Sequence, residues 1–286
     1  FTLLAFLALS SCAVQKPADL VNSNDVERII RTLTADEMQG RASFSPGIDK
    51  AAHFIENEFR QIGLNPIAGE SSFRQQFSMK RIKAGDQKIV INEELIADKA
   101  VMIISDLPTI SYNQTSGIEV ITIKSGESFF KRYKEILQLD KPVLVLVDKA
   151  YTDAFTRLRD NNIKGHLIKS ESEPSGTAVF VLGVNKAQTF SVNFSSQFED
   201  LPLFNVVGVL PGKSKAKEFV IFSAHYDHLG IIDPVEGDSI ANGADDDASG
   251  VTAIISLAKH YKKLNNNERT LIFVAFTAEE IGGFGS

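Results

Sequence analysis

Thr270-Leu-Ile-Phe-Val-Ala-Phe276 is the stretch that decides the fold, because every position after the threonine is apolar. Such a run is typical of a strand in the middle of a sheet that is covered on both faces. Another apolar run, Phe219–Ala224, precedes it, and Val251–Leu264 between them has apolar residues at helical spacing. Strand, helix and strand in this order predict an α/β fold with a mixed central sheet and helices on both faces.

The segment before this unit predicts one more strand of the same sheet. Phe204–Leu210 is apolar, and Pro211-Gly212 separates it from the run that starts at Phe219. Proline and glycine together are typical of a tight turn. We therefore expect Phe204–Leu210 and Phe219–Ala224 to form a hairpin.

Two helices are expected near the N-terminus. Asn24, with Glu27 three residues later, matches the pattern of a helix cap followed by an apolar stripe. For the second helix, Ser45 is the candidate N-cap, Pro46 suits the first turn, and Gly63 suits the position just after the last turn.

From about Lys83 to Phe198 the pattern changes to short apolar runs that alternate with polar loops, which predicts a strand-rich inserted α/β subdomain. Helices are expected around Ser128–Leu137 and Thr152–Arg159. Lys141-Pro-Val-Leu-Val-Leu-Val147, followed by a helix and by Lys164–Ile168, resembles part of a protease-associated domain. The expected strands are Ala100–Ile104, Ile118–Thr122, Val143–Val147 and Ala178–Leu182.

The composition is that of a globular protein and excludes some classes of function. Hydrophobic residues make up 43% and charged residues 23% of the chain, and the formal net charge is −6. No basic face or tail is apparent, so we expect no nucleic-acid partner. Cys12 is the only cysteine, which excludes an intramolecular disulfide and a metal site made of cysteines alone.

Cys12 follows a short apolar segment, Phe1–Ala13, that suits the core of a secretory signal. Leu9-Ser10-Ser11-Cys12 resembles a bacterial lipobox, in which the cysteine is lipidated. This predicts a lipoprotein of the bacterial cell envelope, held at the membrane through Cys12 and facing the periplasm or the exterior. The alternatives are a plain signal peptide or a buried N-terminal strand.

His225 and Asp227 directly follow the apolar run that ends at Ala224. Extended backbone has a period of two residues, so the two side chains can point the same way. His225 can then bind a metal while Asp227 accepts the N–H of the other ring nitrogen. His228 is expected to be solvated or structural.

Gly243-Ala-Asp-Asp-Asp-Ala-Ser-Gly250 places three carboxylates before an apolar helix that starts near Ala248. A helix cap uses one or two acids. Three in succession repel one another unless a cation offsets their charge. One of them can bridge two divalent ions through its two oxygens.

Glu279-Glu280 ends the apolar strand. Adjacent acids at a buried strand end are costly without a partner. In extended backbone they point to opposite sides, so one can bind a metal while the other holds a water for proton transfer. As residues of a surface loop they would need no such explanation.

Taken together, these motifs resemble those of the co-catalytic di-zinc exopeptidases, which include bacterial secreted aminopeptidases, plasma glutamate carboxypeptidase and glutaminyl cyclases. Leu33–Arg41 and Gly47–Leu64 are similar to the N-terminal helices of that family. The central motifs are Ser223-Ala-His-Tyr-Asp-His-Leu-Gly230, Asn242-Gly-Ala-Asp-Asp-Asp-Ala-Ser-Gly-Val251 and Phe276-Thr-Ala-Glu-Glu-Ile-Gly282.

The resemblance implies two zinc ions, peptide substrates and a role for each motif residue. His225 would bind one zinc and Asp227 would orient the histidine. Asp246 would bridge the ions and Glu280 would bind the other zinc, while Glu279 would be the general base. Asp245 and Asp247 would be neighbours that do not bind metal.

The family pattern includes one more acidic ligand and a final histidine after the Glu-Glu pair, so we expect the chain as given to be truncated, to bind metal weakly and to be inactive. Glutaminyl-cyclase-like acyl transfer and a non-catalytic, receptor-like binding module remain as alternatives. The expected organisation is a partial signal peptide (1–11), a tether (12–23), the first part of the peptidase domain (24–82), the insert (83–198) and the catalytic core (199–286).

Overall fold

The computed structural model describes residues 21–139, 141–170, 172 and 176–286. The chain divides into two compact units. Unit 1 comprises Phe1–Phe77 and Leu203–Ser286, and unit 2 comprises Ser78–Pro202. The predicted insert, 83–198, falls inside unit 2. The predicted signal peptide and Cys12 lie outside the described residues.

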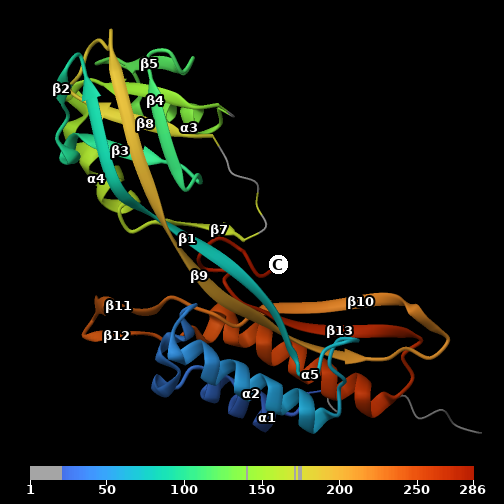
Figure 1. The fold of residues 1–286 in the computed structure, drawn as a ribbon. Coiled ribbons are helices and arrows are strands. Elements are labelled where there is room, and N and C mark those ends of the chain that lie inside the picture. The colour runs from blue at the N-terminus through green and yellow to red at the C-terminus, as the bar shows by residue number, and fades with distance from the viewer. Residues whose placement is uncertain (1–20, 140, 171, 173–175) are drawn as a thin grey trace, which may run out of the picture. The chain divides into compact units, whose positions relative to one another are not determined.

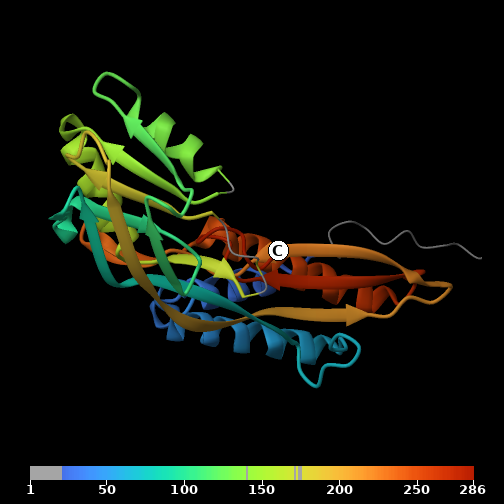
Figure 2. The ribbon, with the colours of Figure 1, turned by 45° about the horizontal axis from the view of Figure 1, so that its top comes forward.

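The first sheet has seven strands among the described residues, in the order β10-β13-β9-β1-β2 (Figures 1 and 2). Off this path, β4 (Thr109–Asn113) pairs with β9 and β7 (His166–Lys169) pairs with β1, and β2 is Glu94–Leu95. Its other strands are β1 (Arg74–Ile91), β9 (Phe190–Leu210), β10 (Lys215–His225) and β13 (Arg269–Phe276). β13 runs parallel to β10 and antiparallel to β9. The sheet is therefore mixed, as predicted, and β13 is an interior strand with β10 on one side and β9 on the other. The α/β fold class is confirmed.

The predicted hairpin between Phe204–Leu210 and Phe219–Ala224 is wrong. Both segments are strands, but β13 lies between them instead of a direct pairing. The Gly212 N–H donates to Thr270 Oγ1 and the Lys213 N–H donates to the Asn267 carbonyl, so this connection binds the segment that enters β13. The apolar pattern marks each strand but does not identify its neighbour.

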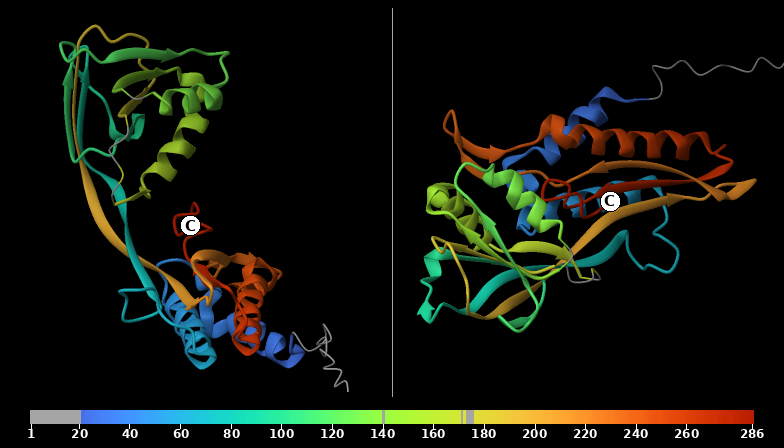
Figure 3. Two further views of the ribbon diagram at one scale, coloured as in Figure 1. Left: turned by 90° about the vertical axis from the view of Figure 1, so that its right-hand side faces the viewer. Right: turned by 90° about the horizontal axis from the view of Figure 1, so that it is seen from above.

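Three helices cover one face of this sheet (Figure 1). They are α1 (Ser23–Leu33), α2 (Pro46–Ile62) and α5 (Ser249–Leu264), and both α1 and α2 pack against α5 (Figure 3). Helices are predicted on both faces of the sheet, and within the described residues they cover this face only. Phe219 and Ile221 of β10 stay about 60% exposed. The buried core on the helical side includes Ile29, Leu33, Ile55, Phe59, Val206, Val251, Ile255, Phe273 and Ala275.

The ends of the first two helices follow local sequence, with one correction. The N-cap of α1 is Asn22, whose side chain accepts the Asn24 N–H, so the predicted cap at Asn24 is wrong by two residues. Helix α2 begins at Pro46 and ends before Gly63, as predicted. Gly63 has φ +78°, a left-handed conformation that glycine adopts without strain.

Unit 2 contains a second sheet with the order β3-β8-β6-β5. Helices α3 and α4 cover one face, and strands β1, β4 and β9 cover the other. β6 is buried at all five positions, as expected for a strand covered on both faces. The elements are β3 (Val101–Ile104), β5 (Glu119–Ile123), α3 (Phe129–Leu137), β6 (Val143–Val147), α4 (Thr152–Asn162) and β8 (Ala178–Leu182), close to their predicted bounds.

The strand after α4 does not join the sheet that contains β6. β7 (His166–Lys169) instead pairs antiparallel with Met79–Ile82 of β1. The predicted strand–helix–strand order of β6, α4 and β7 is present, but the two strands belong to different sheets. The likeness to a protease-associated domain stays a prediction.

The remaining elements are short. None of the described helices is long and apolar enough to cross a bilayer. The described residues also form β2 (Glu94–Leu95), β4 (Thr109–Asn113), β11 (Gly230–Val235), β12 (Asp238–Ala241), and the short helical segments Asp36–Arg41, Asp98–Ala100, Lys149–Tyr151 and Ala244–Ala248.

Candidate metal centre

His225 is the last residue of β10 and lies opposite Phe276 of β13 in the register. Its side chain is 16% exposed. Nδ1 of the ring lies 3.1 Å from the main-chain carbonyl oxygen of Asp227. Because a carbonyl oxygen only accepts, Nδ1 carries the proton and Nε2 faces outward from the strand end.

The three consecutive acids after Gly243 have different environments. Asp247 accepts the His225 main-chain N–H at 3.1 Å and the Gly250 N–H at 2.9 Å, so it ties the start of α5 to the end of β10. Asp246 is exposed, and its Oδ1 lies 2.9 Å from His225 Nε2. Asp245 is also exposed. The side chain directed at His225 Nε2 is therefore the middle one.

Glu279 and Glu280 lie in a turn that follows β13. Ala278 before them has φ +58°, and the Glu279 carbonyl accepts the Gly282 and Gly283 N–H groups. The expectation that this pair is extended is therefore wrong. Even so, the two side chains separate. Glu280 is 17% exposed and contacts His228, whereas Glu279 is 55% exposed and its Oε2 lies 4.0 Å from His225 Nε2.

The structure brings together one side chain from each of the three motifs. One ligand atom each from His225, Asp246 and Glu280 lies within 4.8 Å of the others, and we call these residues the cluster. They come from the end of β10, the turn before α5 and the turn after β13. β10 and β13 are parallel neighbours, so their carboxyl ends meet at one edge of the sheet, and α5 begins beside it.

Asp227 is completely buried and supports the turn after β13 instead of the histidine ring. Its carboxylate accepts the N–H groups of Glu279 at 3.1 Å and Glu280 at 3.3 Å, and the Ser43 hydroxyl at 3.1 Å. The carboxylate is 3.8 Å from His225 Nδ1, which binds the Asp227 main-chain oxygen. Burial raises the pKa of Asp227, although these donors and His225 oppose that rise.

Sequence reasoning missed two supporting residues, Arg41 and Ser43, and undervalued His228. His228 is 11% exposed and its Nδ1 lies 2.7 Å from Glu280 Oε1. Arg41 is 1% exposed and donates to main-chain carbonyls on both sides of the cluster. The sequence signal for Arg41 is that it follows a glycine and belongs to no amphipathic stripe.

The donor set fits a divalent metal such as zinc. Nδ1 of His225 donates to a carbonyl, so a neutral ring presents a lone pair at Nε2, and this lone pair faces an Asp246 oxygen at 2.9 Å. Two such acceptors at this separation repel unless a proton or a cation lies between them. Imidazole and carboxylate are zinc ligands at about 2.0–2.2 Å, so the three side chains would need only small rotations to hold zinc.

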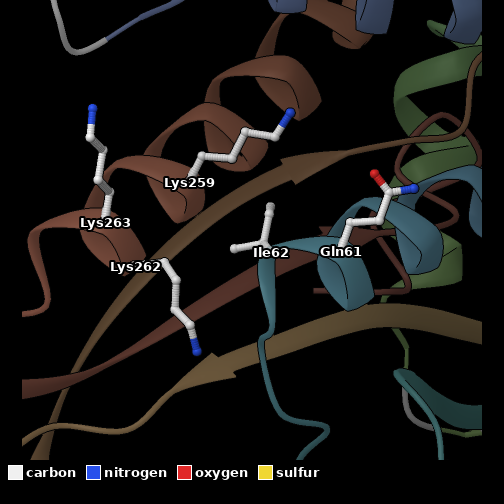
Figure 4. Close-up of a pocket in the computed structure, with 5 residues that line it drawn as sticks. All are labelled: Gln61, Ile62, Lys259, Lys262 and Lys263. Carbon is white, nitrogen blue, oxygen red and sulfur yellow. The ribbon is translucent and has the colours of Figure 1, made fainter.

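A hollow elsewhere in unit 1 has different chemistry. It is lined by Gln61, Ile62, Lys259, Lys262 and Lys263, and Figure 4 shows the lysines around it. Lys262 is engaged with the carbonyl of Gly63, at the end of α2, and Lys259 pairs with Asp25. Ammonium groups do not bind metal cations, so the cluster is the stronger candidate.

Comparison with known proteins agrees with the motifs. Residues 205–286 match Peptidase family M28. A probable zinc metalloprotease of Pyricularia oryzae is 33% identical over 107 residues, which are 37% of this chain and 19% of that protein. A vacuolar membrane protease of Schizosaccharomyces pombe is 27% identical over 132 residues, which are 45% of this chain and 14% of that protein.

Solved structures with similar chains include an aminopeptidase from Aneurinibacillus sp. strain AM-1, with a TM-score of 0.45 and 19% identity. That similarity covers 93% of this chain and 65% of the other. A glutaminyl cyclase of Macrostomum lignano has a TM-score of 0.38 and 12% identity over 97% of this chain and 45% of that one.

The segment that matches Peptidase family M28, residues 205–286, contains the whole cluster. The chain spans only 19% and 14% of the two curated relatives described above.

Proposed function

We propose that this chain contributes the zinc site of a metallopeptidase that removes residues from peptide ends, most simply an aminopeptidase. The observation that carries the proposal is the convergence of His225, Asp246 and Glu280 within 4.8 Å, inside the segment that matches Peptidase family M28. These three residues would hold the metal. Zinc at this position would act as a Lewis acid on the scissile carbonyl and make a bound water more acidic.

The chain's own residues account for the proton transfer. Glu279 is exposed beside the cluster, with Oε2 4.0 Å from His225 Nε2. Its carboxylate would take a proton from the attacking water and pass it to the leaving amine nitrogen. Asp227 would act at one remove, because it fixes the main chain of Glu279 and Glu280.

We propose two zinc ions for the active protein, with Asp246 as the shared ligand. Its carboxylate is 64% exposed and has two oxygens, so Asp246 would be able to help hold both ions. A metal titration followed by elemental analysis tests this number. A single bound equivalent at saturation would contradict it.

The test of the function is hydrolysis of aminoacyl-p-nitroanilides by the protein expressed with any residues that its gene encodes beyond Ser286. We expect activity that a chelator removes and zinc restores. Glu279→Gln should lower kcat by about 10²–10⁴-fold, because the general base is lost while the side-chain size is kept. Zinc affinity of that variant should stay near that of the unchanged protein.

The alternatives give different results in the same assay. An acyltransferase of the glutaminyl cyclase type would cyclise N-terminal glutamine and leave the nitroanilides intact. A binding module would show no chelator-sensitive turnover of either substrate. Glu280→Gln serves as the matched control, because it should weaken zinc binding itself.

We also propose that the protein is a lipoprotein held at a bacterial envelope membrane through Cys12. The support is the lipobox-like Leu9-Ser10-Ser11-Cys12 after an apolar run. Labelled palmitate or glycerol should enter the full-length protein, and Cys12→Ala should abolish the label. Equal labelling of the variant would refute the anchor.

A further inference from the structure

Arg41 is a buried cation below the cluster. It is 1% exposed, and its preceding residues Gln39 and Gly40 share with it a left-handed backbone conformation, with φ between +50° and +61°. Gly40 packs so closely that a Cβ there would lie 2.6 Å from the carbonyl oxygens of Gly230 and Ala241. This tight fit seats the Arg41 main chain against the β11–β12 hairpin.

The guanidinium binds main-chain carbonyls from several separate segments. Nε donates to Tyr226 at 3.0 Å, Nη1 to Leu33 and to Asn242 at 2.7 Å, and Nη2 to Gly243 at 2.9 Å. Tyr226 is the residue after His225, and Gly243 begins the turn that contains Asp246. One rigid planar group therefore sets the separation between the segments that contain two cluster residues.

The main chain of Arg41 reaches the third cluster residue. Its carbonyl accepts the His228 N–H at 3.2 Å, and the His228 ring contacts Glu280 at 2.7 Å. Gly243 lies beside both the His228 ring and the Arg41 guanidinium, because a Cβ there would lie 2.6 Å from the ring and 2.7 Å from Arg41 Nη2. Arg41 is thus within a few contacts of every member of the cluster without touching the ligand atoms.

The charge of Arg41 also has a counterpart. Burial lowers the pKa of the guanidinium, and the nearby carboxylates of Asp227, Asp247 and Asp246 oppose this. The positive charge offsets part of the repulsion among these acids. The charge by itself stabilises the acidic residues when no metal is bound, and so weakens metal binding. The hydrogen bonds hold the ligand segments in place, and so strengthen it.

We propose that Arg41 is a positioning residue for the metal centre, fixing the His225 and Asp246 segments at the separation that a metal ion needs. The proposal rests on the proposed zinc site. In this proposal the essential property of Arg41 is the direction of its hydrogen bonds and not its charge. Lysine carries the same charge but cannot donate in three fixed directions from one plane.

The test compares Arg41→Lys and Arg41→Met with Arg74→Lys in the protein expressed with any residues beyond Ser286. Arg74 is a matched control in unit 1, because it is 18% exposed, bonds Glu56 and Asp49, and does not bond the cluster segments. Zinc affinity is measured by competition with a chelator, Co²⁺ substitution gives a visible spectrum of the ligand geometry, and thermal melts of the metal-free proteins report folding.

Both Arg41 variants should lose about 10–100-fold in zinc affinity, the usual effect of losing support behind metal ligands, and should change the Co²⁺ spectrum. Arg74→Lys should lower the melting temperature and keep the affinity and spectrum. If Arg41→Lys binds as the unchanged protein does while Arg41→Met does not, charge is the essential property and the proposal is wrong. Unchanged binding in both variants also overturns it.

Gly243→Ala gives a second route if neither Arg41 variant folds, because its Cβ would lie 2.5 Å from the Asp246 carbonyl oxygen, 2.6 Å from the His228 ring and 2.7 Å from Arg41 Nη2. It should weaken zinc binding, and wild-type affinity in a folded Gly243→Ala protein would refute the proposal. If the unchanged protein itself binds no zinc, the proposed function fails instead, so the two failures are distinct.

Discussion

The loops at the strand ends of unit 1 and the sheet of unit 2 are fixed by different interactions. In unit 2, β6 lies between helices on one face and strands on the other, and its five residues are all buried. In unit 1, the segments around the cluster are joined by Asp227, Asp247 and Arg41, whose side chains bind main-chain groups of other segments.

This difference separates stability from chemistry. Apolar packing is insensitive to direction, and its contribution depends on the area and volume that are filled. Hydrogen bonds between a side chain and the main chain fix direction, but each adds only about 0.5–1.5 kcal/mol to stability. Substitutions in unit 2 should therefore change unfolding most, and substitutions beside the cluster should change metal binding most.

The largest change in stability is expected from Phe180→Ala in unit 2. Phe180 of β8 is fully buried and its ring lies 5.5 Å from that of Tyr133. Removing it should lower the free energy of unfolding by about 3–5 kcal/mol, measured by denaturant titration, with zinc affinity unchanged. Phe198, which is 43% exposed, is the matched control, and Phe198→Ala should change little. A loss of zinc affinity in folded Phe180→Ala would break the comparison.

Asp227→Asn tests the other half of the comparison. The amide keeps the size of the carboxylate but presents an NH₂ group to the main-chain donors of Glu279 and Glu280. We expect a loss of about 1–3 kcal/mol in stability and about 10–100-fold in zinc affinity. Denaturant titration and chelator competition measure the two quantities.

Asp49, an exposed acid that pairs with Arg74, provides the control for the same chemical change. Asp49→Asn should leave zinc affinity unaltered. Equal zinc affinity in Asp227→Asn and the unchanged protein would mean that the turn after β13 keeps its conformation without the carboxylate.

Glu58→Gln should give the smallest effect and make it depend on pH. Glu58 of α2 is nearly buried and pairs with Arg28 of α1 and Lys259 of α5. Desolvation alone would raise the pKa of Glu58, but the hydrogen bonds and charges of Arg28 and Lys259 lower it below its ordinary value of 4.5.

Because the folded-state pKa is lowered, the pair stabilises the fold above pH 4.5, and that contribution is lost as the pH falls through the folded-state pKa. At pH 7 the variant should be about 1 kcal/mol less stable, since Arg28 is partly exposed. In acid, the free energies of unfolding of Glu58→Gln and of the unchanged protein should converge. Glu27→Gln, in an exposed pair with Arg31, is the control and should change the free energy of unfolding little at pH 7.

The sequence predicted those features of the fold that are encoded locally. β6 and β8 have the predicted bounds, and α2 begins at Pro46 and ends before Gly63, because apolar runs, proline and glycine act within a few residues. Strand order was not predictable in this way. β13 separates β9 from β10 through contacts between residues about sixty positions apart, such as Leu271 and Leu210.

The same division applies to the candidate site. His225, Asp246 and Glu280 belong to motifs that the residue types alone identify, and the structure places their ligand atoms together. The residues that hold them were harder to find. Arg41 works through carbonyl oxygens, which are present at every position and leave no pattern in the sequence. The positive φ of Ala278, which turns the Glu279–Glu280 pair, likewise has no signal in an alanine.

The exposed outer edge of β10 affects how the chain behaves in solution. Among the described residues, β10 is the edge strand at one end of the order β10-β13-β9-β1-β2, and Phe219 and Ile221 are exposed on it. An apolar strand whose outer edge offers free amide and carbonyl groups is adhesive toward other extended chains. At high concentration, copies of this chain should therefore associate through the edge of β10. Any segment that pairs with that edge should prevent the association.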